Sequence, residues 1–163
     1  MPTSLTTTVL RSVSEVEQIR SLWSSWQWHP NSDIDYYLSW FQFRPEFRRP
    51  HIILTTRNGQ PEAMLIGRFE EMRITDFKIG PWRIFKPRGR VVSFIYCGLL
   101  GNATPENCEA MVQEIIKLLR AGEADMATIN NVRTDSPLYA ALNHGRGFRS
   151  QDYFNSIYTA AHK

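Results

Sequence analysis

The sequence has little cysteine, no long apolar stretch and no recognisable leader. Its two cysteines, Cys97 and Cys108, are too few for a disulfide framework or a four-ligand zinc site, so we expect two free thiols and no metal. No uninterrupted apolar run approaches the roughly 20 residues that span a bilayer. The first residues lack the basic and apolar regions of a signal peptide. These absences predict a cytoplasmic protein that makes no membrane contact.

Internal repeats and low-complexity tracts are also missing, and the size is that of one domain. The 163 residues include 42% apolar and 21% charged side chains, the balance of a soluble globular protein. A chain of this length buries about 70% of the surface that it exposes when unfolded, so its core can hold it together. We therefore expect a single domain over residues 1–163.

Positive charge is concentrated in the middle of the chain. Residues 44–90 hold eleven Lys or Arg against five Asp or Glu, a local net charge of +6, whereas the whole chain carries +3. This favours an anionic ligand, although a solvated sheet surface has the same composition. The basic run from Arg83 to Arg90 is too short for nucleic acid and no recognition helix accompanies it, so we expect no nucleic-acid partner.

Apolar residues at helical spacing predict four helices, at about 14–28, Asp33–Phe43, Thr104–Arg120 and Ser136–His144. Ser14 and Glu17 form a capping-box pattern at the start of the first helix. Asn31 or Ser32 is expected to cap the second helix. Pro105 suits the first position of the third helix, and Gly122 is expected to end it.

Strand patterns occupy the remaining segments, Thr3–Leu10, His51–Thr56, Glu62–Glu70, Met72–Lys78, Val91–Leu100, Ala124–Val132 and Phe148–Tyr158. Asn58-Gly59 is a strong hairpin signal between two of them. If Val91–Leu100 is counted with the hairpin strands as one meander, the element order is β-α-α-β-β-β-α-β-α-β. Hairpins followed by crossovers predict an α/β fold, with a mixed sheet and helices on both of its faces.

This order is similar to that of the GNAT (Gcn5-related N-acetyltransferase) superfamily. Three segments, Leu22–Phe41, Arg49–Glu70 and Val91–Gly101, resemble the N-terminal lobe of two-lobed bacterial acyltransferases of the FemAB-like and cellulose-biosynthesis (CelD) types. The resemblance extends from about Ser14 to Phe148. It implies a splayed mixed sheet that holds acetyl-CoA or another acyl-CoA as co-substrate, with an amine attacking the thioester directly. It also implies a second lobe, or a homodimer partner contacting the aromatic-rich helices, unless this lobe works alone.

The superfamily's phosphate loop, Gln/Arg-x-x-Gly-x-Gly/Ala, is matched in part. Gly101 and Ala103 fall on the last two motif positions, whereas Gly98 replaces the Gln or Arg. Amides at a helix start suit a pyrophosphate, so the resemblance implies a cofactor-binding segment of Gly98, Leu99, Leu100, Gly101, Asn102, Ala103 and Thr104. A turn that binds nothing is the alternative. On this basis Gly101→Asp should abolish CoA binding and leave the fold largely intact.

The resemblance also implies candidate catalytic and acceptor-binding residues. Where active members often have a tyrosine that protonates the CoA thiolate, this chain has Asn143, which has no proton to give. Nearby His144 and Tyr139 are therefore candidate catalytic groups. Relatives contact the acceptor at the junction between the first two helices. There the resemblance implies His29 as a third candidate catalytic residue, and Asp33, Tyr36 and Tyr37 as substrate-binding residues. A helix break with a cap explains the same junction without any chemistry.

Nine of the 20 aromatic residues lie within the 25 positions from Trp23 to Phe47. Most rings of such a cluster are expected to pack in a core under the sheet. Rings that remain exposed would instead line an acceptor cleft or contact a second lobe. The sequence therefore predicts an acyl-CoA-dependent N-acyltransferase acting on a small-molecule or peptide amine. The alternative is a catalytically silent GNAT-like lobe that binds a second lobe or a partner.

Overall fold

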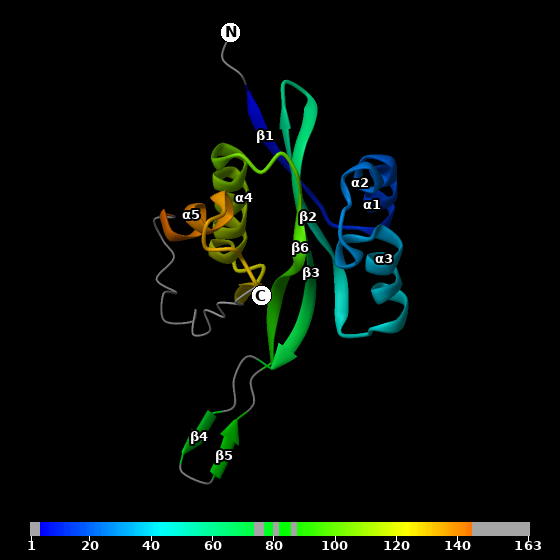
Figure 1. The fold of residues 1–163 in the computed structure, drawn as a ribbon. Helices are drawn as coiled ribbons and strands as arrows, with labels where there is room; N and C mark the ends of the chain where they lie inside the picture. Colours follow the sequence, from blue (N-terminus) through cyan, green and yellow to red (C-terminus); the bar gives the residue numbers. More distant parts are fainter. Residues whose placement is uncertain (1–3, 74–76, 80–81, 86–87, 145–163) are drawn as a thin grey trace, which may run out of the picture.

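A five-stranded mixed sheet runs through the centre of the computed structural model, which describes residues 4–73, 77–79, 82–85 and 88–144 (Figure 1). Its strands lie side by side in the order β1 (Leu5–Leu10), β2 (Phe47–Arg57), β3 (Gln60–Arg73), β6 (Arg88–Gly101) and β7 (Met126–Ile129). Neighbouring strands are antiparallel except β6 and β7, which are parallel. A parallel neighbour requires a crossover, and a helix supplies it here.

Helices cover the two faces of this sheet in separate layers (Figure 1). One layer holds α1 (Val13–Gln18), α2 (Arg20–Trp26), the 3₁₀ turn η1 (Pro30–Ser32) and α3 (Ile34–Phe43). The other layer holds α4 (Pro105–Arg120) and α5 (Pro137–His144). The predicted α/β fold with a mixed sheet is confirmed. No helix within the described residues has both the length and the apolar character needed to cross a bilayer.

Two short strands stand apart from the main sheet. β4 (Phe77–Ile79) and β5 (Trp82–Phe85) pair with each other beyond the far ends of β3 and β6 (Figure 1). The strand predicted over Met72–Lys78 is divided between two strands, because β3 continues to Arg73 in register with β6 and β4 begins at Phe77. The strands predicted over Phe148–Tyr158 lie outside the described residues.

Capping groups were predicted correctly for α4 but not for the first helices. Ser12 and Glu15, rather than Ser14 and Glu17, form the capping box of α1. Asp33, rather than Asn31 or Ser32, caps α3 by accepting the Tyr36 amide at 2.8 Å. Several polar side chains in a row can each cap a helix, so the choice depends on where tertiary packing lets the first turn begin.

The hairpin and the two cores follow the sequence pattern more closely. Asn58 and Gly59 have φ values of +51° and +79°, as a two-residue hairpin turn requires. Between the sheet and α1–α3, one core is built around Trp23 and Tyr37, both fully buried. The other core, between the sheet and α4–α5, contains Cys108 and Met111. Both cysteines are free, as expected.

A buried histidine makes this fold sensitive to acid. His51 is 1% exposed, and neither ring nitrogen has a hydrogen-bond partner in the described chain. Its ring packs edge-on against Phe69 and Phe94. Burial, reinforced by the charges of Arg49 and Arg11 against the weaker opposing effect of Glu123 and Glu114, lowers the pKa of His51 from 6.5 to about 4. The imidazole is therefore neutral in the folded protein near pH 7.

We expect the free energy of unfolding of the His51→Leu variant to depend less on pH between about 6.5 and 4 than that of the wild type. The unfolded chain takes up a proton on His51 below about pH 6.5, but the folded chain does so only near pH 4, so protonation favours unfolding within that interval. Between these pH values the free energy of unfolding of the wild type should fall by up to about 3 kcal/mol more than that of the variant. Urea unfolding from pH 7.5 to 4 measures this difference, and parallel curves would contradict it.

Candidate functional site

The ladder between β6 and its neighbours is interrupted in the middle of the sheet. β6 pairs with β7 only through Val91–Phe94, opposite Met126–Ile129, and then continues to Gly101. On its other side, four β6 residues, Ile95–Gly98, stand opposite the single β3 residue Ile66. Such a bulge bends a strand and re-aims its side chains. The two parallel strands therefore share only a short paired stretch, and the bulge follows directly after it.

Two residues carry the unusual backbone of the bulge. Cys97 has a φ of +58°, which non-glycine residues rarely adopt. A Cβ atom on Gly98 would lie 2.5 Å from Ile95 Cγ1 and 3.1 Å from the Ile66 carbonyl oxygen. Gly98 is thus needed for close packing inside the sheet.

The other apolar residues of the expected cofactor segment also point inward. Leu100 is 1% exposed and belongs to the core under α1–α3. Leu99 and Ala103 pack against the core on the α4 side. Besides the side chains of Asn102 and Thr104, only backbone groups of this segment are thus left for a phosphate.

Those backbone groups are largely used by the protein itself. The Asn102 amide donates to the Glu62 carbonyl at 2.7 Å, and the Thr104 amide donates to the Asn102 carbonyl at 2.9 Å. The Thr104 hydroxyl caps α4 by accepting the Asn107 amide at 3.2 Å. Pro105, at the first position of the helix, has no amide hydrogen. Little of the usual anion-binding capacity of a helix start remains.

The charges around this turn are balanced without a ligand. Arg57 donates to Glu62 at 2.8 Å and to Glu106 at 2.7 Å. The Asn107 side chain donates to the other Glu62 oxygen at 3.0 Å. A pyrophosphate here would meet two carboxylates and an arginine that is already paired. This arrangement leaves few free donors for the diphosphate of CoA.

His29 lies beside the bulge, and its ring accepts a hydrogen bond from the backbone. Its Nδ1 accepts the Asn31 amide at 3.1 Å, so the neutral ring carries its proton on Nε2. The ring contacts Trp28 and Tyr96, each with 5.5 Å between ring centroids. To act as a base, His29 would have to give up the Asn31 bond. Its clear role is to cap η1, while Nε2 can donate to a ligand.

An exposed tyrosine completes this corner. Tyr96 lies within the bulge and is 45% exposed, and a side-chain hydrogen bond with the adjacent Cys97 raises the pKa of its hydroxyl. Trp28 is 67% exposed on the other side of His29. The corner thus presents aromatic faces, a hydroxyl and an imidazole N–H, a set that suits a cationic or polar ligand.

The three expected substrate-binding residues have different positions. Asp33 uses one oxygen to cap α3 and the other to accept from Gln27 at 3.1 Å. Tyr37 is fully buried, donates to the Gly67 carbonyl at 2.6 Å, and has its pKa raised by burial. Only Tyr36 is exposed, packed edge-on against Trp40. As substrate contacts, Asp33 and Tyr37 are not supported, because folding already uses their polar atoms.

The remaining catalytic candidates belong to the opposite layer. Tyr139 is half-buried on α5, which packs on α4, whereas His29 lies with α1–α3 across the sheet (Figure 1). His144 ends α5, and its side chain lies outside the described part of the chain. The structure therefore does not bring Tyr139 to His29.

A polar row on the α1–α3 face of the sheet was missed from the sequence. Arg68 and Glu70 on β3 are followed across the sheet by Ser93 on β6 and Thr128 on β7. The Thr128 hydroxyl donates to Ser93 at 2.9 Å, and the Ser93 hydroxyl donates to Glu70. The available signal was two charged residues at alternate positions of a strand, in phase with the buried Met64 and Ile66.

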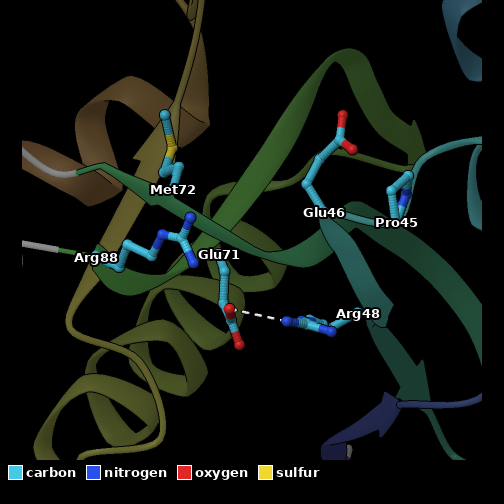
Figure 2. Close-up of a pocket in the computed structure, with 6 residues that line it drawn as sticks. All are labelled: Pro45, Glu46, Arg48, Glu71, Met72 and Arg88. Atoms are coloured by element: carbon cyan, nitrogen blue, oxygen red, sulfur yellow. Dashed lines mark hydrogen bonds and ion pairs between the residues drawn. The ribbon is translucent and has the colours of Figure 1, made fainter.

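A surface depression of about 350 Å³ lies elsewhere, toward the β4–β5 end of the sheet. It is lined by Pro45, Glu46, Arg48, Glu71, Met72 and Arg88 (Figure 2). Arg48 and Glu71 form an ion pair of 2.8 Å inside it (Figure 2). Seven positions along β6 separate Arg88 from Ile95, so this depression is not part of the bulge region.

Comparison with known proteins adds no family assignment. No protein-family model matches the sequence, and no curated protein is significantly similar to it.

We expect Gly101→Ala to destabilise the fold. Gly101 has a φ of +81°, and a Cβ there would lie 2.4 Å from the Glu62 carbonyl oxygen. Gly59 is a matched control, because its φ is +79° but a Cβ would meet nothing within 4 Å. Gly59→Ala should cost roughly 1–2 kcal/mol from the left-handed backbone alone. Overpacking should add about 1–3 kcal/mol at Gly101, as measured by chemical unfolding.

Equal losses in the two variants would show that the turn relaxes freely. The same contact overturns the expectation that Gly101→Asp leaves the fold intact, so that variant cannot serve as a clean test of CoA binding.

Proposed function

We propose that this chain is a GNAT-type lobe that takes part in acyl transfer to an amine and supplies the acceptor side of the cleft. The observation that carries this proposal is that the pairing of β6 with β7 ends at Phe94, directly before the bulge Ile95–Gly98. Among the described strands, none pairs with β6 on the β7 side beyond Phe94. An extended ligand can use the backbone groups of such an edge.

The corner formed by Trp28, His29 and Tyr96 favours an amine as the ligand. A primary amine is protonated at neutral pH, and aromatic faces attract cations. The His29 Nε2–H group can orient a carbonyl oxygen next to the amine. Together these groups can bind and orient an acceptor. They do not include a free acceptor atom that would remove its proton.

The acceptor side is favoured over the acyl-donor side by the turn after β6. Its Asn102 and Thr104 amides are engaged within the protein, and Glu62 and Glu106 lie beside it. In the two-lobed acyltransferases that the sequence resembles, the second lobe usually holds CoA. A donor bound by a second lobe, in the same or another chain, is consistent with this division of roles.

A second candidate is an N-acyltransferase that binds acyl-CoA by itself. It is favoured by the strand–glycine–helix arrangement, in which Gly101 has a φ of +81° three residues before the cap of α4 at Thr104. This is the arrangement that phosphate loops use.

Titration with acetyl-CoA separates the two candidates. For an acceptor-side lobe we expect no calorimetric heat and no change in thermal unfolding. For a chain that binds CoA, a ligand concentration 100-fold above the dissociation constant should add about 2.7 kcal/mol of stability. Saturable binding would select the second candidate. Free CoA, which shares the diphosphate but lacks the acyl group, is the ligand control.

The acceptor side is tested with L-leucinamide, an amine that lacks a carboxylate. We expect it to shift the NMR signal of the Trp28 indole N–H, and Tyr96→Ala should weaken this effect at least 5-fold. Phe43→Ala is the control, because Phe43 is an exposed aromatic residue at the end of α3 that belongs to neither contact region. An amine that perturbs neither Trp28 nor its neighbours would refute the acceptor-side proposal.

A further inference from the structure

Arg68 is held in an unusual setting on the sheet face that carries α1–α3. Its guanidinium carbon lies 4.4 Å from the ring centre of Trp40 and 4.0 Å from that of Phe47. Only 18% of the side chain is exposed. Two aromatic contacts fix the plane of the guanidinium, so its N–H groups point in defined directions before any ligand arrives.

These N–H groups are not used within the described part of the protein. Arg68 donates no hydrogen bond there, and its Nε is buried without a partner. Its nearest carboxylate oxygen, on Glu70, is 3.8 Å from Nε, beyond the 2.7–2.9 Å of a charge-assisted hydrogen bond. Other arginines do donate to carboxylates at 2.6–2.9 Å, namely Arg11, Arg20, Arg48, Arg57, Arg90 and Arg133. Arg68 is thus a rigid cation with spare donors.

Glu70 is held beside it by the other members of the polar row. The Ser93 hydroxyl donates to Glu70 Oε1, and the Thr128 hydroxyl supports Ser93 from the next strand. Glu70 Oε2 is the oxygen that faces Arg68. The Glu70 side chain is 12% exposed, so its charge is poorly screened by solvent. One carboxylate oxygen is thereby positioned, and the other is left for a cation.

We propose that Arg68 and Glu70 form a binding site for an α-amino acid, with the ligand carboxylate on Arg68 and the ligand ammonium on Glu70. The two protein charges lie close together but are not hydrogen-bonded to each other, which matches the adjacent opposite charges of a zwitterion. Planar guanidinium groups bind carboxylates through two parallel hydrogen bonds. This inference rests on the proposed function and deepens it, because it names the acceptor class as amino acids.

The polar row and the bulge share the strand β6. Ser93 lies three residues before Tyr96 on β6, and the α1–α3 face of the sheet carries both the polar row and the His29 corner. Ser93, which donates to Glu70, therefore belongs to the same strand as Tyr96 and the unpaired β6 edge.

Three compounds that share the leucine side chain test the site by NMR titration, and the signal of the Trp40 indole N–H reports binding. They are L-leucine, L-leucinamide without the carboxylate, and N-acetyl-L-leucine without the amine. We expect L-leucine to bind at least 10-fold more tightly than either of the others. Arg68→Lys, which keeps the charge but loses the planar fork, should weaken L-leucine at least 10-fold and leave L-leucinamide unchanged.

Glu70→Gln should weaken both amine probes and leave N-acetyl-L-leucine unchanged. Glu71→Gln is the matched control, because it is the same change at the next residue, in the ion pair with Arg48. Equal affinity for L-leucine and L-leucinamide would overturn the amino-acid site, while leaving the acceptor-side proposal standing if L-leucinamide still shifts Trp28. If Arg68→Lys does not fold, the relative affinities of the three compounds for the wild-type protein test the amino-acid site instead. Binding of none of them would refute both proposals.

Discussion

Four residues of β6 stand opposite one residue of β3, and the pairing of β6 with β7 ends immediately before them. This mismatch at Ile95–Gly98 is the constraint on which the candidate site depends. β7 itself ends at Ile129, so none of the described strands pairs with the β6 edge beyond Phe94. Tyr96, within the bulge, contacts the His29 ring, whereas Ser93, before the bulge, keeps the regular register that places it opposite Arg68.

The two faces of the sheet are packed for different purposes. On the α4–α5 side, apolar residues of α4 pack continuously against the strands, and the α4 start is closed by Thr104 and Asn107. On the α1–α3 side, the apolar core around Trp23 and Tyr37 gives way to aromatic rings that hold a charged side chain. Arg68 and Glu70 replace apolar residues at inward positions there. Buried charges cost stability unless they are compensated, which is why a position of this kind suggests a ligand.

Local patterns were good predictors wherever one interaction decides the outcome. Asn58-Gly59 marks the hairpin because a turn with two positive φ angles strongly favours Asn followed by Gly, and Thr104-Pro105 marks the start of α4. Patterns failed where several residues compete. Ser12 and Ser14 can both cap a helix, and the chain uses Ser12. In the candidate site, the pattern pointed to Asp33 and Tyr37, but their hydrogen bonds within the fold were invisible in the sequence.

The sequence by itself determined the class of the fold, the extent of the long helix α4, the buried strand β6 and the excess of positive charge near the middle of the chain. These properties depend on periodicity and composition, which are local. Only the tertiary structure decided that Gly98 packs inside a bulge, that the amides after Gly101 are already used, and that Arg68 lies between Trp40 and Phe47. Those features join residues far apart in the chain, and their geometry depends on strand register, which no single segment encodes.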